Sequence, residues 1–215
     1  SFDTINAAGG FVAGTLPPLV SATAVTNGSS IASSVTASAT IEYWTGKINS
    51  NWDINTTTNW TLNSAPAKYA NGNVVQFDDS ASNATVTVTT TVLPNGVFVN
   101  NSVLSYALSG SPIGGASSLT KLGDGALSLF NANSYSGGTT VNAGALVIDG
   151  VSNTTTGANI VNGGKLQIGS GGSTGDIGSG AVTVAAGATL EFNRSNTTPG
   201  TADLDYKTNA KLRNV

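Results

Sequence analysis

The sequence predicts an all-β fold, a parallel β-solenoid in which each short repeat forms one rung. A motif recurs four times between Leu119 and Phe192, with an apolar residue three positions before a glycine and an alternating apolar pair after it. The copies recur at roughly 20 to 24 residues, a spacing typical of solenoid rungs. No window shows the 3.6-residue apolar spacing of a helix, and Gly, Asn, Ser and Thr interrupt every apolar run at strand length.

Each copy of the motif predicts a turn followed by a strand. The glycine suits a tight turn because it adopts positive φ without steric cost. The two apolar residues after it alternate along the strand and point to one face. Because stacked rungs share one apolar core, the pairs are the predicted solenoid core. These core residues are Leu127, Leu129, Leu146, Ile148, Leu166, Ile168, Leu190 and Phe192.

Residues 1–42 are predicted to form an extended N-terminal arm. The segments Val20 to Val25 and Ile31 to Ile41 alternate weakly between apolar and polar residues. Isolated strands of this kind are not stable and need a sheet edge. The arm is therefore either a first rung with a tail or a strand that completes a neighbouring subunit.

Residues 43–118 are predicted to form a Trp-rich capping segment and the first rungs. The three tryptophans, Trp44, Trp52 and Trp60, lie close together, and Tyr69 follows them. A solenoid needs a cap because its terminal rung otherwise exposes strand edges. Alternatively, the four aromatic side chains form a sugar-stacking platform, since aromatic faces offer large rigid contact areas. Residues 119–192 then contain the repeats, and residues 193–215 form a terminal rung or tail.

Two adjoining stretches carry a family resemblance. Leu119–Leu129 reads LTKLGDGALSL, and Ser134–Leu146 reads SYSGGTTVNAGAL. Together they resemble the autotransporter-associated β-strand repeat, and the Trp-rich run from Trp44 to Asp78 resembles the segment that often precedes such repeats. The resemblance implies a right-handed parallel β-helix displayed outside the bacterial cell, secreted or at the cell surface. It supplies no catalytic residues.

The composition excludes several kinds of partner. Only 9% of residues are charged and the net charge is −3, so the chain has neither a basic nucleic-acid footprint nor a polybasic membrane patch. No apolar run approaches membrane-spanning length. The absence of His and Cys removes the Ser-His and Cys-His nucleophiles and the commonest transition-metal ligands.

The carboxylates do not predict an enzyme. Glycosidase sites on solenoids need two carboxylates on neighbouring rungs. Asp78 and Asp79 are adjacent, so on a strand they face opposite ways. The segment Gly171–Ile177 faintly resembles a calcium-binding nonapeptide, but a plain Gly-rich loop is predicted because no second copy stacks on it. We therefore expect no catalytic residue, cofactor or metal. Of the repeat positions expected to stack, only Glu191 is acidic. These positions are Ser128, Val147, Gln167 and Glu191.

The predicted function is an extracellular structural protein, a self-assembling β-solenoid subunit of a surface filament or layer. A solenoid exposes unpaired backbone groups at its ends. The predicted Trp-rich cap covers one end, the other end has no obvious cap, and the N-terminal arm needs a sheet edge. End-to-end contacts that do not close produce filaments. We therefore expect a homo-oligomer or polymer. The alternative is an adhesin or carbohydrate-binding passenger fragment, in which Trp44, Trp52, Trp60 or Tyr69 stacks on surface glycans.

Overall fold

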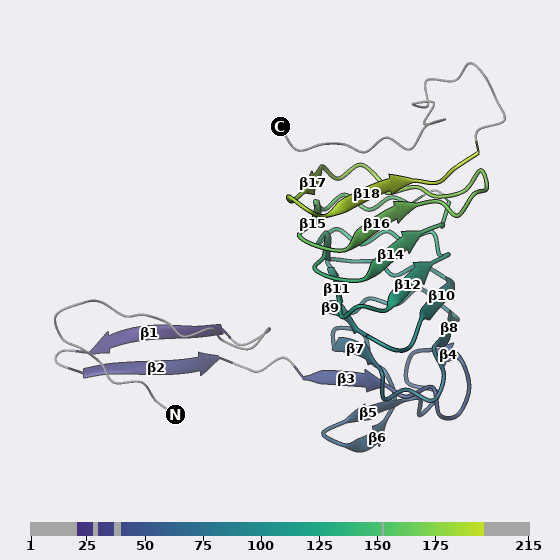
Figure 1. Cartoon of the computed structure of the whole chain (residues 1–215). Helices are drawn as coiled ribbons and strands as arrows, with labels where there is room; N and C mark the ends of the chain where they lie inside the picture. Colours follow the sequence, from purple (N-terminus) through teal and green to yellow (C-terminus); the bar gives the residue numbers. More distant parts are fainter. Residues whose placement is uncertain (1–20, 28–29, 37–39, 152, 196–215) are drawn as a thin grey trace. The chain divides into compact units, whose positions relative to one another are not determined.

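The computed structural model describes residues 21–27, 30–36, 40–151 and 153–195. These residues form strands, turns and loops, with no helix among them. The chain divides into two units, Ser1–Thr40 and Ile41–Val215 (Figure 1). The second unit is a parallel β-solenoid, so the predicted fold class is confirmed.

The described residues of the first unit form an antiparallel hairpin. Its strands are β1 (Ser21–Asn27) and β2 (Ser30–Thr36), paired along their whole length from Ser21–Thr36 to Asn27–Ser30. Ser21–Val25 of the first predicted segment thus pairs with Ala32–Thr36 of the second, whereas Ile41 begins a strand of the other unit. Strand addition to a neighbouring subunit stays a prediction, and residues 1–20 lie outside the described residues.

A nine-stranded sheet forms one wall of the second unit. Seven of its strands are parallel, and a short antiparallel hairpin continues the sheet beyond β3. In spatial order the strands are β17 (Val182–Val184), β15 (Asn159–Val161), β13 (Thr139–Val141), β11 (Leu119–Leu122), β9 (Gly96–Asn100), β7 (Val74–Asp78), β3 (Ile41–Trp44), β5 (Trp60–Leu62) and β6 (Ala65–Ala67).

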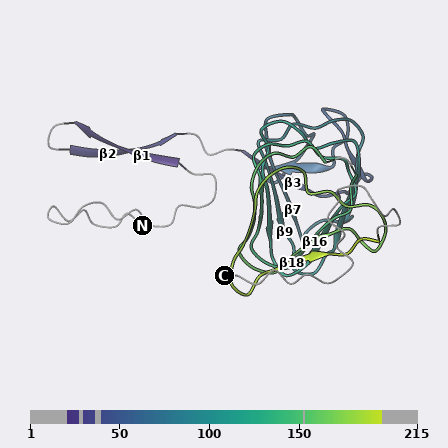
Figure 2. The ribbon, with the colours of Figure 1, turned by 90° about the horizontal axis from the view of Figure 1, so that it is seen from above.

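A seven-stranded parallel sheet forms the second wall of the solenoid. From β7 onward the chain alternates between the two sheets, so each turn adds one strand to each (Figure 2). In spatial order its strands are β18 (Thr189–Phe192), β16 (Lys165–Ile168), β14 (Ala145–Ile148), β12 (Ala126–Leu129), β10 (Tyr106–Gly110), β8 (Thr85–Val88) and β4 (Asn51–Trp52).

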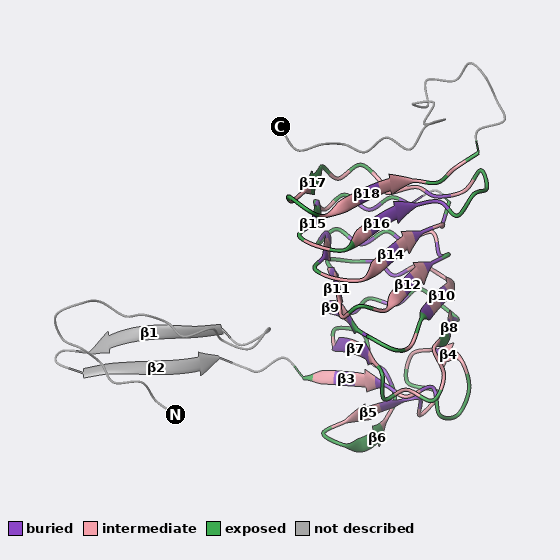
Figure 3. Cartoon of the chain, viewed as in Figure 1, coloured by how far each residue is buried: buried purple, intermediate pink, exposed green. Residues whose placement is uncertain are grey.

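The interior consists of side-chain columns that run across the strands. Strand pairing places Leu127, Leu146, Leu166 and Leu190 in one column, and the first three are 0% exposed. Buried and partly exposed positions alternate along β12 and β14, whereas three of the four residues of β16 are buried (Figure 3). Burying one leucine fully stabilises the fold by about 1.5–3 kcal/mol. The neighbouring column contains Leu129, Ile148, Ile168 and Phe192, the last only partly buried.

Glycine is required at the turns that precede the repeat strands. Gly144 and Gly164 both have φ of +65°, a conformation that L side chains rarely adopt. A Cβ on Gly144 would lie 2.3 Å from the carbonyl oxygen of Gly125, one rung away. The turns therefore stack backbone against backbone. The right-handed twist of the solenoid and the four predicted segment boundaries stay predictions.

Candidate functional site

The four aromatic residues singled out from the sequence lie inside the solenoid. Trp44, Trp52 and Tyr69 are 0% exposed, and Trp60 is 1% exposed. Their rings contact one another edge to face, with centroids 5.0 Å apart for Trp44–Trp60 and 5.3 Å apart for Trp52–Tyr69. Because both faces of each ring are covered, none is available to stack on a sugar in this structure. Whether the cluster acts as a cap stays a prediction.

Two further aromatic residues extend this cluster. The Phe77 ring lies 5.5 Å from the rings of Trp52 and Trp60, and Tyr106 lies 5.4 Å from Phe77. The inward alternation of β7 could have identified Phe77 from the sequence, whereas Tyr106 lies in a segment with no clear pattern. The cluster therefore joins the first rungs into one apolar core.

A buried asparagine holds the loop that positions Trp52. The Oδ1 atom of Asn59 accepts hydrogen bonds from the backbone N–H groups of Ile48, at 3.0 Å, and Asn49, at 3.2 Å. Its Nδ2 atom donates to Asn49 Oδ1 and to the carbonyl oxygen of Asn51, both at 2.8 Å. All four hydrogen-bonding positions of this amide are thus used within the protein.

The interior near the aromatic cluster contains one carboxylate. Glu42 is 1% exposed and accepts a hydrogen bond from Asn73 Nδ2 at 2.8 Å. Its other oxygen has no partner among the described residues. Burial raises the pKa of Glu42 above its ordinary value, although the hydrogen bond from Asn73 opposes this. Burial likewise raises the pKa of Tyr69, and the nearby Glu42 charge adds to that effect.

A lysine also faces the interior, which the sequence analysis did not anticipate. Lys121 is 0% exposed, and its Nζ atom donates to the carbonyl oxygens of Leu122 at 2.5 Å and Gly123 at 2.7 Å. Burial lowers the pKa of Lys121 to about 8, while the charges of Asp124 and Asp79 act in the opposite direction. The alternation of β11 from Leu119 would have placed this lysine inward.

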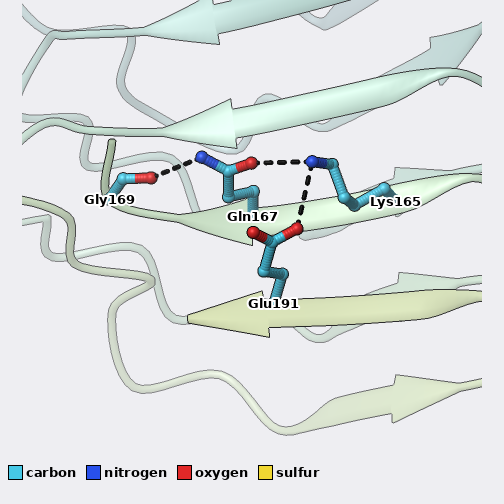
Figure 4. Close-up of polar contacts among 4 residues, drawn as sticks. All are labelled: Lys165, Gln167, Gly169 and Glu191. Carbon is cyan, nitrogen blue, oxygen red and sulfur yellow. Dashed lines mark hydrogen bonds and ion pairs between the residues drawn. The ribbon is translucent and has the colours of Figure 1, made fainter. Parts of the chain in front are cut away.

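A polar cluster lies on the outer face of β16 and β18 (Figure 4). The ammonium of Lys165 contacts Gln167 Oε1 at 2.8 Å and Glu191 Oε2 at 3.0 Å, and Gln167 Nε2 donates to the Gly169 carbonyl oxygen at 2.8 Å. The Lys165 and Glu191 side chains are 37% and 33% exposed, so this ion pair contributes little to stability. The predicted stacking of four outward positions is confirmed: Ser128, Val147, Gln167 and Glu191.

The carboxylates of the loops accept hydrogen bonds from neighbouring protein groups. Asp79 accepts three backbone N–H groups, from Ser102 to Leu104, and these bonds hold the pKa of Asp79 below its ordinary value. Asp149 accepts the hydroxyl groups of Ser170 and Thr174, each at 2.5 Å. Across the described ranges, no group of three or more Asp and Glu side chains could hold a metal ion. These aspartates connect loops of neighbouring rungs.

The described residues contain no helix long and apolar enough to cross a membrane.

Comparison with known proteins identifies the repeats. The sequence profile of the passenger-associated-transport-repeat family matches residues 119–148 and 143–168. Over 115 residues the chain is 43% identical to the adhesin BmaC autotransporter of Brucella suis biovar 1. The aligned region covers 53% of this chain and 3% of that protein. The chain thus spans a small fraction of this relative's length. No solved structure matches the chain. Residues 119–168 are therefore passenger-associated transport repeats, and they lie in a parallel β-solenoid that is similar in sequence to a small part of an autotransporter adhesin.

Proposed function

We propose that this chain is a β-solenoid shaft segment in the passenger region of a bacterial surface adhesin, with a structural rather than an enzymatic role. Such a segment would hold adhesive surfaces away from the cell. The passenger repeats and the likeness to an adhesin autotransporter support this placement.

The observation that carries the proposal is the unbroken parallel pairing of both sheets. Seven strands of one sheet and all seven of the other pair in parallel, and Leu127, Leu146 and Leu166 stack without a gap. Each rung contacts its neighbours through both sheets, so bending one rung requires its neighbours to move. A stack of this kind suits a stiff extended element.

The non-enzymatic role rests on how the polar side chains are used. Lys165 and Glu191 pair with each other, and Asp79 and Asp149 accept hydrogen bonds from protein groups. Glu42 is enclosed by the protein. General acid–base chemistry needs a carboxyl group within hydrogen-bond reach of a substrate. A self-assembling filament subunit, the other function expected from the sequence, gains no support from the comparisons and stays a prediction.

Surface display tests the proposal. In cells that produce the natural protein, antibodies raised against residues 41–195 should label intact cells, and external protease should remove the signal. A deletion of residues 119–168 should reduce adhesion of the cells, because it shortens and disrupts the shaft. Labelling that appears only after lysis, or adhesion that is unchanged by the deletion, would contradict the proposal.

A further inference from the structure

The outer face of the nine-stranded sheet carries a row of uncharged side chains that the shaft role does not require. Strand pairing aligns one outward residue from each of six consecutive strands, β5, β3, β7, β9, β11 and β13. All are partly exposed, whereas their neighbours along β3 and β9 are buried. We call them the neutral row: Thr61, Tyr43, Gln76, Phe98, Thr120 and Thr140.

The two aromatic residues of the neutral row lie on alternate strands. Tyr43 pairs with Gln76, and Gln76 pairs with Phe98, so two strand spacings, about 9.6 Å, separate the aromatic positions. Strands β3, β7 and β9 lie over one another when viewed along the stack (Figure 2). Gln76 occupies the position between the two aromatic residues, and its side-chain amide can both donate and accept hydrogen bonds.

The Phe98 ring lies along the sheet rather than standing away from it. A Cβ placed on Gly96, two residues earlier on the same face of β9, would be 3.4 Å from Phe98 Cε2. The ring therefore lies close to Gly96, where the missing side chain leaves room for it, and Phe98 remains partly exposed. A flat outward aromatic face is the surface on which a sugar ring packs.

We propose that the neutral row binds an extended, neutral, β-linked polysaccharide that runs across the strands. Sugar rings in such a chain follow one another at roughly the separation of neighbouring strands, so Tyr43 and Phe98 would stack on alternate rings. Gln76 and the threonine hydroxyl groups would hydrogen-bond to the sugar hydroxyls. The absence of charge in the row suits a neutral chain, because a charged polysaccharide would lose hydration without gaining an opposite charge.

Affinity electrophoresis in gels containing hydroxyethylcellulose, together with sedimentation on microcrystalline cellulose, tests the proposal on the purified full chain. The wild-type chain should be retarded and should sediment with cellulose at low and high salt. Tyr43→Ser and Phe98→Ser should each weaken binding about three- to tenfold, the loss expected for one aromatic contact. The matched control is Phe130→Ser, because Phe130 is 49% exposed and follows β12 of the other sheet; it should leave binding unchanged.

Far-UV circular dichroism of every variant separates loss of binding from loss of fold. Phe98→Leu retains an apolar side chain but removes the ring, so it should remain folded and still bind more weakly. The proposal would be overturned if the wild-type chain were not retained, or if Tyr43→Ser and Phe98→Leu were retained as strongly as the wild-type chain. A loss of binding in Phe130→Ser equal to that in Tyr43→Ser would also overturn it. Preferential binding to anionic alginate, or self-association that Tyr43→Ser abolishes, would also overturn it. Because the shaft role is tested by surface labelling, its failure is distinguishable from failure of the neutral row.

Discussion

Replacing Leu146 by alanine should destabilise the solenoid by about 3 kcal/mol. Leu146 is 0% exposed and stacks between Leu127 and Leu166 of the adjoining strands. Truncation of a buried leucine costs about 2–5 kcal/mol, because the lost burial adds to the cost of the cavity. Backbone pairing holds the strands on both sides at a fixed separation, so the cavity collapses poorly. Urea unfolding monitored by far-UV circular dichroism measures the change in the free energy of unfolding.

The matched control for this prediction is Val147→Ala on the same strand. Val147 faces outward and is partly exposed, so its truncation should cost less than about 1 kcal/mol. A double substitution of Leu146 and Leu166 should cost less than the two single costs together, because the two cavities merge. If Leu146→Ala cost no more than Val147→Ala, the shared interior column would not be the main source of stability, and the reasoning would fail.

Three other substitutions test the turns and the buried charges. Gly144→Ala should cost at least about 2 kcal/mol in urea unfolding, whereas Gly187→Ala, with positive φ but no atom within 4 Å of the added Cβ, should cost only about 1 kcal/mol; equal costs would contradict the close backbone approach. Burial lowers the pKa of Lys121 from its ordinary 10.5 to about 8, so between these two pH values the unfolded chain binds more protons than the folded protein. The free energy of unfolding of the wild-type chain should therefore contain a contribution that rises with pH across this range, and Lys121→Met should lack it. The pKa of Glu42 is raised above 4.5, so its contribution to stability should fall as pH rises through the raised value; Glu42→Gln should flatten this decline in pH-dependent thermal unfolding, and an unchanged profile would refute the assignment.

Repeats predict a solenoid well because each copy repeats the same local physics. The Gly-turn and alternating strand around Leu127 recur around Leu146 and Leu166, and strand pairing at one rung sets the register at the next. The first rungs lack this internal copy. From the sequence alone, Trp52 could lie in a core or on a sugar-binding surface, because an aromatic residue suits both. Only the packing of β4 against β8 places it inside.

Polar side chains in the interior were harder to anticipate. A lysine on a strand is normally outward, but the inward ammonium of Lys121 donates hydrogen bonds to the carbonyl oxygens of Leu122 and Gly123, at the end of β11. Likewise, the sequence shows Asp79 only as a carboxylate next to Asp78. Its three backbone donors come from a loop more than twenty residues later. Such contacts depend on which loops adjoin across rungs, and local pattern does not encode that.

The same geometry explains why the repeat identifies the fold more readily than the function. Inward positions must be apolar and of similar size, because each contacts the equivalent residue of the next rung. Outward positions are free of that constraint, so Ser128, Val147 and Glu191, which are all partly exposed, share a column without sharing chemistry. A specific binding property of one solenoid segment must therefore reside in its outward rows. The row from Tyr43 to Phe98 differs from this column by combining aromatic rings with an amide on successive strands. The proposed recognition by this segment therefore centres on Tyr43, Gln76 and Phe98 of the first rungs, and the row continues into the repeats through Thr120 and Thr140.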